Sequence, residues 1–286
     1  MGKIVIVVDS IACVPKEEMV RHGIKMVPVN IFFNGKVYRD QVDITAEQAY
    51  ELLEKAPDFW KSSSASPEEY LKVFQEVSGY AEGVVVITLS SKLSMFYSSA
   101  LVAKGILAEK KSSLRVEVVD SRTAAAAEGL VALAAARAAE AGKSLDGVVE
   151  VAEQVRQKVG FIGLLETIRY VYRTGRIPKV ASELGSVLSV KPILTSADGT
   201  IHFAGMVRSK QSGVERMLKM MKDALRGSKA VHAAVMHAAC PDEAEKFKER
   251  IASEFNCTEL YMTDFSPVMG YATGRGTLAV AFYGED

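Results

Sequence analysis

Four apolar runs, each ending in or followed by polar residues, organise the first part of the chain. They lie at 3–9, 83–89, 116–119 and 160–165. Such runs are typical of parallel strands that are buried on both faces and carry polar residues at their carboxyl ends. Helical stretches fall between them: one opens at Ser66 with a capping box, and others cover 95–110 and 123–141. This alternation predicts an α/β fold in which helices cover both faces of a parallel sheet.

The second half of the chain has a different pattern. Asp198-Gly199 separates the apolar segments 191–195 and 200–207, which is a strong signal for a β-hairpin. Further helices are expected at 209–225 and 242–255, and further strands at 231–237, 258–265 and 277–283. These elements predict an α+β domain with a mixed sheet. We therefore expect two domains, 1–160 and 161–286, which suits a chain of 286 residues.

Composition narrows the choice of partners. Lys plus Arg and Asp plus Glu both total 35, so the chain has no net charge that would attract nucleic acid. The apolar run after the first residues is too short for a signal peptide or a spanning helix, so we expect a cytoplasmic protein without stable membrane insertion, for which transient membrane contact stays open. The cysteines, Cys13, Cys240 and Cys257, fit neither a disulfide framework nor a zinc site. We expect no metal and no cofactor.

Polar residues that follow the apolar runs are the first candidates for a site, because ligands of parallel sheets bind beyond the carboxyl ends of the strands. The segment Leu89 to Ser94 joins a predicted strand to a predicted helix, and it directs Ser94 and free backbone N–H groups to a point that suits an anion. Ser94 would equally be an ordinary helix cap, and its spacing does not separate the two roles. A second hydroxyl cluster, Ser62 to Ser66, fits an anion site or a solvated loop with an N-cap.

Motifs for other chemistry are missing from the sequence. The chain has no G-x-G-x-x-G after a strand and no P-loop, and its segment Gly270 to Thr277 is expected to be a tight turn. The nucleophile elbow G-x-S-x-G does not occur either. One alternative function is an acyl hydrolase or transferase with Ser94 as nucleophile and His237 as base, which requires the two side chains to approach within about 3 Å. A sugar- or nucleotide-binding regulator is a second alternative.

Several segments, taken in order, resemble the DegV family, which includes the fatty-acid-binding B subunits of bacterial fatty acid kinase. These segments are Val8 to Ser10, Ser62 to Pro67, Leu89 to Ser94 with Tyr97, Val119 to Ser121, Arg173 to Ile177, Gly185 to Leu194 and Gly270 to Gly276. The resemblance covers nearly the whole chain. It implies two α/β domains with a long-chain fatty acid buried in a tunnel between them.

The resemblance also implies roles for particular residues. Ser62 and Ser94 match the leading contacts of the fatty acid carboxylate, and Ser63 and Ser91 are second choices. A separate ATP-dependent fatty acid kinase subunit is the implied partner, which would convert the presented carboxylate to an acyl phosphate. Arg173 and Arg176 match the partner-facing surface, although arginines at a helix end also compensate the helix dipole. The protein itself is then a lipid-binding protein, not an enzyme, and has no catalytic residue.

Three positions depart from the usual pattern of the family. Ile11 stands where the family has Thr, Ala272 where it has a His that helps to hold the carboxylate, and Met95-Phe96 where small residues are common. The first two departures remove hydrogen-bonding side chains near the expected carboxylate. The third predicts a tunnel head of different shape.

Overall fold

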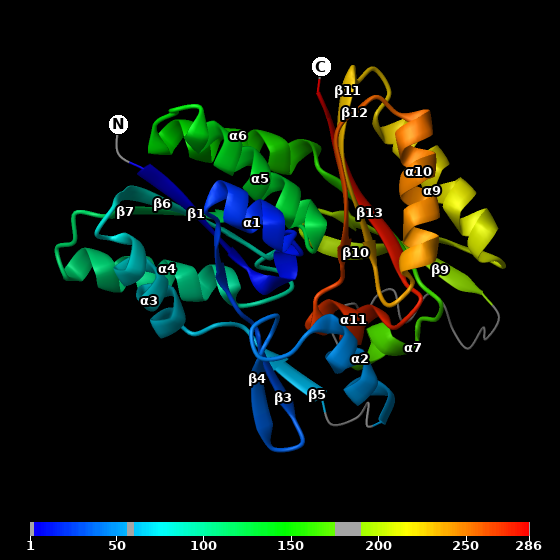
Figure 1. Ribbon diagram of the computed structural model, residues 1–286, viewed down its shortest axis with the longest axis horizontal. Helices are drawn as coiled ribbons and strands as arrows, with labels where there is room; N and C mark the ends of the chain where they lie inside the picture. Colours follow the sequence, from blue (N-terminus) through cyan, green and yellow to red (C-terminus); the bar gives the residue numbers. More distant parts are fainter. Residues whose placement is uncertain (1–2, 56–59, 175–189, 286) are drawn as a thin grey trace.

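The chain folds around two larger sheets and one small sheet (Figure 1). The computed structural model describes residues 3–55, 60–174 and 190–285. In Figure 1 the first sheet and its helices form the left part of the molecule, the second sheet forms the right part, and the small sheet lies below them. No helix within the described ranges is both long enough and apolar enough to cross a bilayer.

The first sheet is parallel throughout, as the apolar runs predict. Its strand order is β2-β1-β6-β7, with β1 at Lys3–Asp9, β2 at Lys25–Val27, β6 at Ala81–Thr88 and β7 at Arg115–Asp120. The central strands β1 and β6 are buried along most of their length, because helices cover both faces. Their carboxyl ends therefore meet at one edge of the sheet.

Helices cover this sheet on its two faces (Figure 1). Helices α5 (Ala126–Glu140) and α6 (Leu145–Lys158) pack on one face, with α1 (Lys16–His22) against α5, and α3 (Pro67–Val77) and α4 (Phe96–Glu109) pack on the other. Helix α5 also contacts the second sheet, so nearly all of its residues are buried. Its small side chains allow this close approach: a Cβ on Gly129 would lie 2.5 Å from the carbonyl oxygen of Ala12, in the short 3₁₀ helix Ser10–Ala12.

The second sheet is mixed, as expected for an α+β arrangement. Its strand order is β10-β9-β8-β13-β11-β12, with β8 at Gly160–Leu164, β9 at Lys191–Ala197, β10 at Thr200–Val207, β11 at Ala230–His237, β12 at Cys257–Asp264 and β13 at Leu278–Glu285. Helices α9 (Lys210–Ala224) and α10 (Pro241–Glu254) cover its outer face. The hairpin predicted at Asp198-Gly199 is confirmed, with both residues at positive φ.

One expectation about the apolar runs is wrong. The run at 160–165 forms β8, which pairs antiparallel with β9 and β13 in the second sheet and is not a further strand of the parallel sheet. The strand lies in the interior of its sheet and is buried on both faces, so its composition resembles that of a parallel strand. Helix α6 ends at Lys158, just before this strand, and the division of the chain into domains at residue 160 stays a prediction.

The small sheet is antiparallel and was not expected from the sequence. It has the order β4-β3-β5, with β3 at Asn30–Phe33, β4 at Lys36–Arg39 and β5 at Trp60–Ser63. Helices α2 (Ala46–Lys55), α7 (Arg169–Thr174) and α11 (Pro267–Thr273) lie beside it (Figure 1). The expected loop at Ser62 and Ser63 is therefore a strand, and much of the expected turn after Gly270 is helical.

Close contacts hold α11 and α2 together. A Cβ on Gly270 would lie 1.7 Å from the ring of Tyr50, so only glycine fits at this helix crossing. The hydroxyl of Tyr50 donates to the carbonyl oxygen of Phe265 at 2.9 Å. This contact fixes the segment that leads from β12 into α11.

Polar contacts join the regions of the two larger sheets. The hydroxyl of Ser90, beyond β6, donates to the carbonyl oxygen of Gly199 in the β9–β10 hairpin at 2.6 Å. In the last turn of α5, Arg137 donates to Glu259 of β12 at 3.0 Å and to the hydroxyl of Tyr283 of β13 at 3.2 Å. Both contacts link segments that lie far apart in the sequence.

His232 extends the second of these contacts. Its ring stacks on that of Tyr283, with centroids 4.4 Å apart, and its nitrogens lie 2.8 Å from Glu259 and 2.9 Å from Glu285. Burial opposes a positive charge on the imidazole, but the hydrogen bonds to the two carboxylates outweigh it and raise the pKa of His232. The ring of His232 therefore links β11 to β12 through Glu259 and to β13 through Glu285.

Candidate functional site

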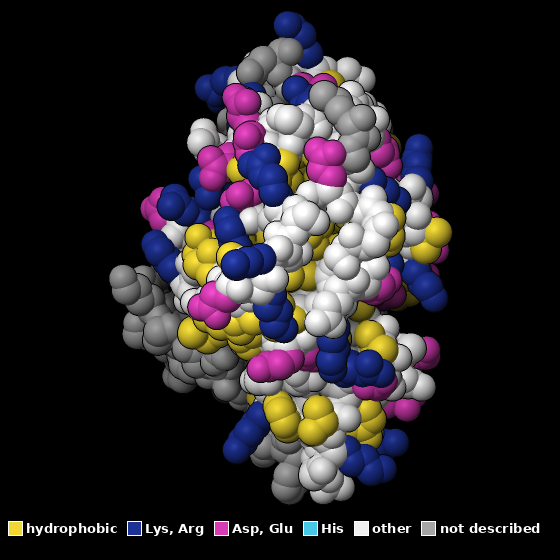
Figure 2. Space-filling view, turned by 90° about the vertical axis from the view of Figure 1, so that its left-hand side faces the viewer, with side chains coloured by type: hydrophobic (Ala, Val, Ile, Leu, Met, Phe, Trp, Pro, Cys, Tyr) yellow, Lys and Arg dark blue, Asp and Glu magenta, His cyan; other side chains and the backbone are white. Residues whose placement is uncertain are grey.

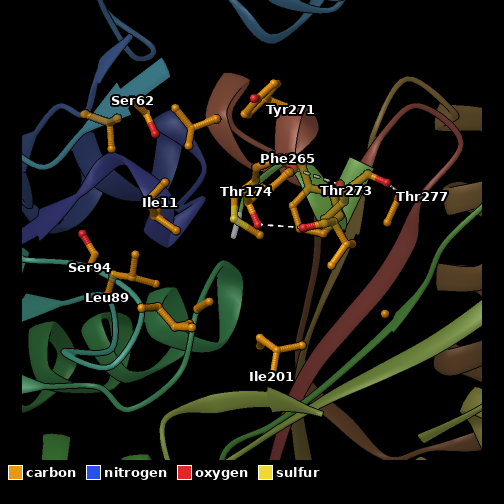
Figure 3. A pocket seen from close by; sticks show the side chains of 18 of the residues that line it. Ile11, Ser62, Leu89, Ser94, Thr174, Ile201, Phe265, Tyr271, Thr273 and Thr277 are labelled. Carbon is orange, nitrogen blue, oxygen red and sulfur yellow. Dashed lines mark hydrogen bonds between the residues drawn. The ribbon is translucent and has the colours of Figure 1, made fainter. Parts of the chain in front are cut away.

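A cavity of about 390 Å³ lies where the two larger sheets and the small sheet meet (Figure 3). Its wall is mainly apolar, and the apolar side chains come from all three regions; they include Ile11, Leu89, Phe96, Phe161, Leu194 and Ile201. Volumes of this size are typical of small-molecule sites. The cavity can therefore hold an extended apolar ligand.

Ser62 and Ser94, which are distant in the sequence, line this same cavity. Ser62 comes from β5 and Ser94 from the turn that precedes α4, and in Figure 3 both lie on the side of the cavity formed by the first part of the chain. Neither hydroxyl forms a hydrogen bond within the described ranges, so both can donate to a ligand. The two leading candidates are thus brought together beside an apolar space.

Threonine hydroxyls on the other side of the cavity are already used. Thr174 donates to the carbonyl oxygen of Val171 at 2.9 Å, Thr273 to that of Met269 at 2.8 Å, and Thr277 to that of Thr273 at 3.1 Å. These bonds satisfy backbone carbonyls at the ends of α7 and α11 (Figure 3). The serines are therefore the better donors for a ligand.

The two second-choice serines are placed less favourably. The hydroxyl of Ser91 donates to Asp120 at 2.6 Å, and Ser91 is not among the described residues that line the cavity. Its expected role as a carboxylate contact therefore gives way to a structural one, a bond between the carboxyl ends of β6 and β7. Ser63 borders the cavity, but strand alternation directs its side chain to the face opposite that of Ser62.

The expected partner-facing arginines lie at the limit of the described region. Arg173 is within α7, but its side chain is not among the described ones, and Arg176 lies outside the described residues. Val171 and Thr174 of the same helix line the cavity. Helix α7 is therefore part of the cavity wall.

Buried carboxyl groups support the wall from behind. Asp9 is fully buried and accepts hydrogen bonds from the backbone N–H groups of Leu89 at 2.8 Å and Ile11 at 3.0 Å, both of which line the cavity. Asp40 accepts from the hydroxyl of Ser10 at 2.6 Å. Burial raises the pKa of each of these carboxyl groups to about 7. Their role is to hold the backbone that carries the wall.

Glu128 of α5 lies behind Asp9 and is fully buried. Burial raises its pKa well above the ordinary value, and the neighbouring Asp9 raises it further. Burial and the neighbouring Asp9 therefore both favour the neutral form of the Glu128 carboxyl group.

The described residues of the cavity wall carry few ionisable side chains. Among its described residues there is no histidine, and Lys61 is the only basic one. His237 lies at the end of β11, where its Nδ1 is 3.3 Å from Asp264, and burial lowers its pKa. Within the described ranges, no group of three or more His, Cys, Asp or Glu side chains could hold a metal ion. The hydrolase alternative, which needs His237 beside Ser94, finds no support here.

Two aromatic residues of the wall were missed in the sequence. Trp60, the only tryptophan of the chain, is 3% exposed, stacks on Tyr271 with ring centroids 5.6 Å apart, and accepts a hydrogen bond from the Tyr271 hydroxyl at its backbone oxygen. Phe33 also packs against Trp60, with ring centroids 5.8 Å apart. A lone tryptophan just before the serine cluster was the available signal.

Comparisons of sequence and of structure with known proteins all point to the same family. Residues 3–285 match a family model described as "Uncharacterised protein, DegV family". A DegV domain-containing protein of Caldanaerobacter subterraneus is 30% identical over 284 residues, which cover 99% of each chain. A fatty-acid-binding DegV family protein of Thermus thermophilus has 28% identity and a TM-score of 0.91, with 99% of each chain covered. A stearic-acid-binding protein of Eubacterium ventriosum has 26% identity and a TM-score of 0.90, with 100% and 99% of the chains covered.

Proposed function

The chain belongs to the DegV family, and on this premise we propose that it binds a long-chain fatty acid in the cavity. The acyl tail lies among the apolar side chains, and the carboxylate accepts hydrogen bonds from Ser62 and Ser94. The observation that carries this proposal is that two hydroxyls from distant segments, neither bonded to a described residue, line one apolar cavity. The fatty acids bound by the Thermus and Eubacterium proteins support the class of ligand.

The apolar wall supplies the main part of the affinity. Each methylene that leaves water contributes about 0.8 kcal/mol, so about ten buried methylenes contribute about 8 kcal/mol. Association costs several kcal/mol in lost motion, which leaves affinity dependent on how well the tail fits. Saturated and unsaturated chains should therefore differ in affinity according to the bends that the cavity accepts.

The carboxylate of the ligand needs hydrogen-bond donors more than it needs apolar contact. An unpaired carboxylate in an apolar site is costly, and hydroxyl and backbone N–H donors offset this cost. The first turn of α4 begins two residues after Ser94 and has backbone N–H groups without helical partners, and its dipole favours an anion. Ser62, from β5, and Ser94, from the turn before α4, complete this set of donors.

The protein serves as the lipid-binding half of a two-component reaction. A partner fatty acid kinase subunit would phosphorylate the bound carboxylate with ATP, and Arg173 and Arg176 would contact that partner. The binding protein contributes no catalytic residue. We expect Arg173→Ala and Arg176→Ala to slow acyl phosphate formation by such a kinase and to leave fatty acid affinity unchanged. Equal loss of fatty acid affinity would contradict this assignment.

Extraction of the purified protein tests the proposal most directly. Organic extraction followed by mass spectrometry should recover one fatty acid per protein chain. Delipidated protein titrated with stearate should show a change in the fluorescence of Trp60, because this tryptophan lines the cavity and has no other tryptophan to mask it. Protein that holds no lipid after purification and does not respond to fatty acid would refute the proposal. Turnover of acyl esters that is lost in Ser94→Ala would instead establish the hydrolase.

A further inference from the structure

Three carboxyl groups are buried behind the cavity wall. They are those of Asp9 at the end of β1, Asp40 after β4 and Glu128 in α5, and each residue is at most 1% exposed. Asp9 is the central member, because its charge acts on the carboxyl groups of both Asp40 and Glu128. We call these three residues the buried acid cluster.

The buried acid cluster is in contact with the backbone of the cavity wall. Asp9 accepts hydrogen bonds from the N–H groups of Leu89 and Ile11. The backbone N–H group of Val268, a further residue of the wall, faces Asp40. In Figure 3, Ile11 and Leu89 lie on the same side of the cavity as the two leading serines. The cluster is therefore behind the part of the wall at which we place the ligand carboxylate.

The titratable groups that face the buried acid cluster from neighbouring elements are themselves acids. They are Cys13, Tyr50 of α2, Tyr70 of α3 and Asp120 of β7. Among the described residues, no Lys, Arg or His side chain forms an ion pair with any member of the cluster. On the outer surface, by contrast, acidic side chains lie among basic ones (Figure 2). A negative charge that enters the cavity therefore finds no compensating charge in the cluster.

The wall itself adds little positive charge. Lys61 is its only basic residue in the described ranges. Residues opposite each other in antiparallel strands point to the same side, and Lys61 is opposite Phe32, which is 41% exposed. The side chain of Lys61 therefore points to the outer face of the small sheet, away from the buried acid cluster.

We infer that binding of a ligand carboxylate is coupled to the uptake of a proton from solvent by the buried acid cluster. This inference rests on the proposed function, because it requires an anionic ligand at Ser62 and Ser94. Two like charges about 10 Å apart in a protein interior repel each other strongly enough to lower an affinity about tenfold. A proton on Asp9 or Asp40 removes this repulsion.

Two members of the cluster titrate close to neutral pH. Burial raises the pKa of Asp9 and that of Asp40 to about 7, although the N–H groups on Asp9 and the Ser10 hydroxyl on Asp40 oppose this rise. A bound anion raises both pKa values further, so the complex holds more protons than the free protein. The affinity for an anionic ligand therefore falls as pH rises through about 7. At lower pH both acids are already protonated, and the affinity no longer depends on pH.

Titrations followed by Trp60 fluorescence test this inference with the full chain. The probes are laurate, dodecanesulfonate, whose charge does not change in this pH range, and uncharged dodecanol. Wild-type protein should bind both anions about tenfold more weakly at about pH 8 than at about pH 6, and should bind dodecanol equally at both. Calorimetry of dodecanesulfonate binding near pH 7, in two buffers of different ionisation enthalpy, should show net proton uptake.

Substitutions in the cluster remove the titrating groups. Asp9→Asn and Asp40→Asn should each reduce the pH effect on laurate affinity to about threefold, and the double variant should nearly abolish it. Asp43→Asn is the matched control, because hydrogen bonds from Arg39 lower the pKa of the exposed Asp43 to about 2. This control should keep the wild-type pH profile. Unchanged affinity for dodecanol identifies the variants in which the cavity remains formed.

The outcomes separate this inference from the proposed function. Wild-type protein that binds all three probes without proton uptake and without a pH effect on the anions would overturn the inference alone. A wild-type pH profile in the folded double variant would also overturn it. Where the variants do not fold, the calorimetry of the wild type decides. Protein that binds none of the probes would refute the proposed function, and the inference with it.

Discussion

The serine pair makes a quantitative prediction about ligand affinity. In Ser94→Ala and Ser62→Ala, a ligand carboxylate loses one donor that has no other partner within the described protein. A hydrogen bond to a charged group contributes about 1.5–3 kcal/mol, so each substitution should weaken fatty acid binding about 10- to 100-fold. If both serines bind the same carboxylate, the double variant should deviate from additivity by at least about 0.5 kcal/mol.

Trp60 fluorescence during titration with stearate and with stearyl alcohol measures this effect. The serine variants should lose less affinity for the alcohol, because a hydrogen bond between neutral groups contributes only about 0.5–1.5 kcal/mol. Ser91→Ala is the matched control, since its hydroxyl is bonded to Asp120 outside the cavity. Serine variants that bind stearate as tightly as wild type, or a Ser91→Ala variant that weakens as much as Ser94→Ala, would refute the assignment.

Three further substitutions test the contacts that stabilise the fold around the cavity. His232→Gln should lower the free energy of unfolding by about 1–2 kcal/mol near pH 6. Because the pKa of His232 is raised in the folded protein, its stabilisation is complete below about pH 6.5 and is lost as pH rises through the folded pKa. Thermal melts of the variant and the wild type should therefore converge at alkaline pH. Gly270→Ala should cost about 3 kcal/mol or more in denaturant unfolding, because its Cβ meets the Tyr50 ring, whereas Gly79→Ala has open space and should be nearly neutral. Ala125→Gly should raise stability by about 1 kcal/mol in the same assay, since Ala125 has φ 55° and ψ −147°, a conformation that strains any residue with a Cβ; an unchanged midpoint would contradict that strain.

The elements that the sequence predicted correctly are those with a clear local pattern of residues. The strands β1, β6 and β7 follow from long apolar runs, and α5 follows from an alanine-rich stretch that ends near Gly142. The orientation of β8 could not follow in this way, because burial on both faces makes parallel and antiparallel strands alike in composition. Orientation depends on the connections, which are set by the whole chain.

The small sheet and the site show the same limit. Strands of four residues are stabilised by tertiary contacts, such as those of Trp60 with Phe33 and Tyr271, and local patterns do not reveal them. The resemblance to a family drew attention to the serine clusters. It could not separate Ser94, whose hydroxyl has no partner among the described residues, from Ser91, whose hydroxyl donates to Asp120. That distinction requires the positions of neighbouring strands.

The register of the small sheet determines which of its side chains face the cavity. Ser62 faces the cavity because it is opposite the buried Ile31, and Phe32 faces outward because it alternates with Ile31. A slip of one residue would exchange the two faces, which would remove the Ser62 hydroxyl from the cavity and bury Lys61 in its place. The stacking of Trp60 on Tyr271 of α11 opposes such a slip, because it attaches the inner face to the second half of the chain. Loss of the Trp60 contact should therefore impair ligand affinity even though the Ser62 hydroxyl is retained.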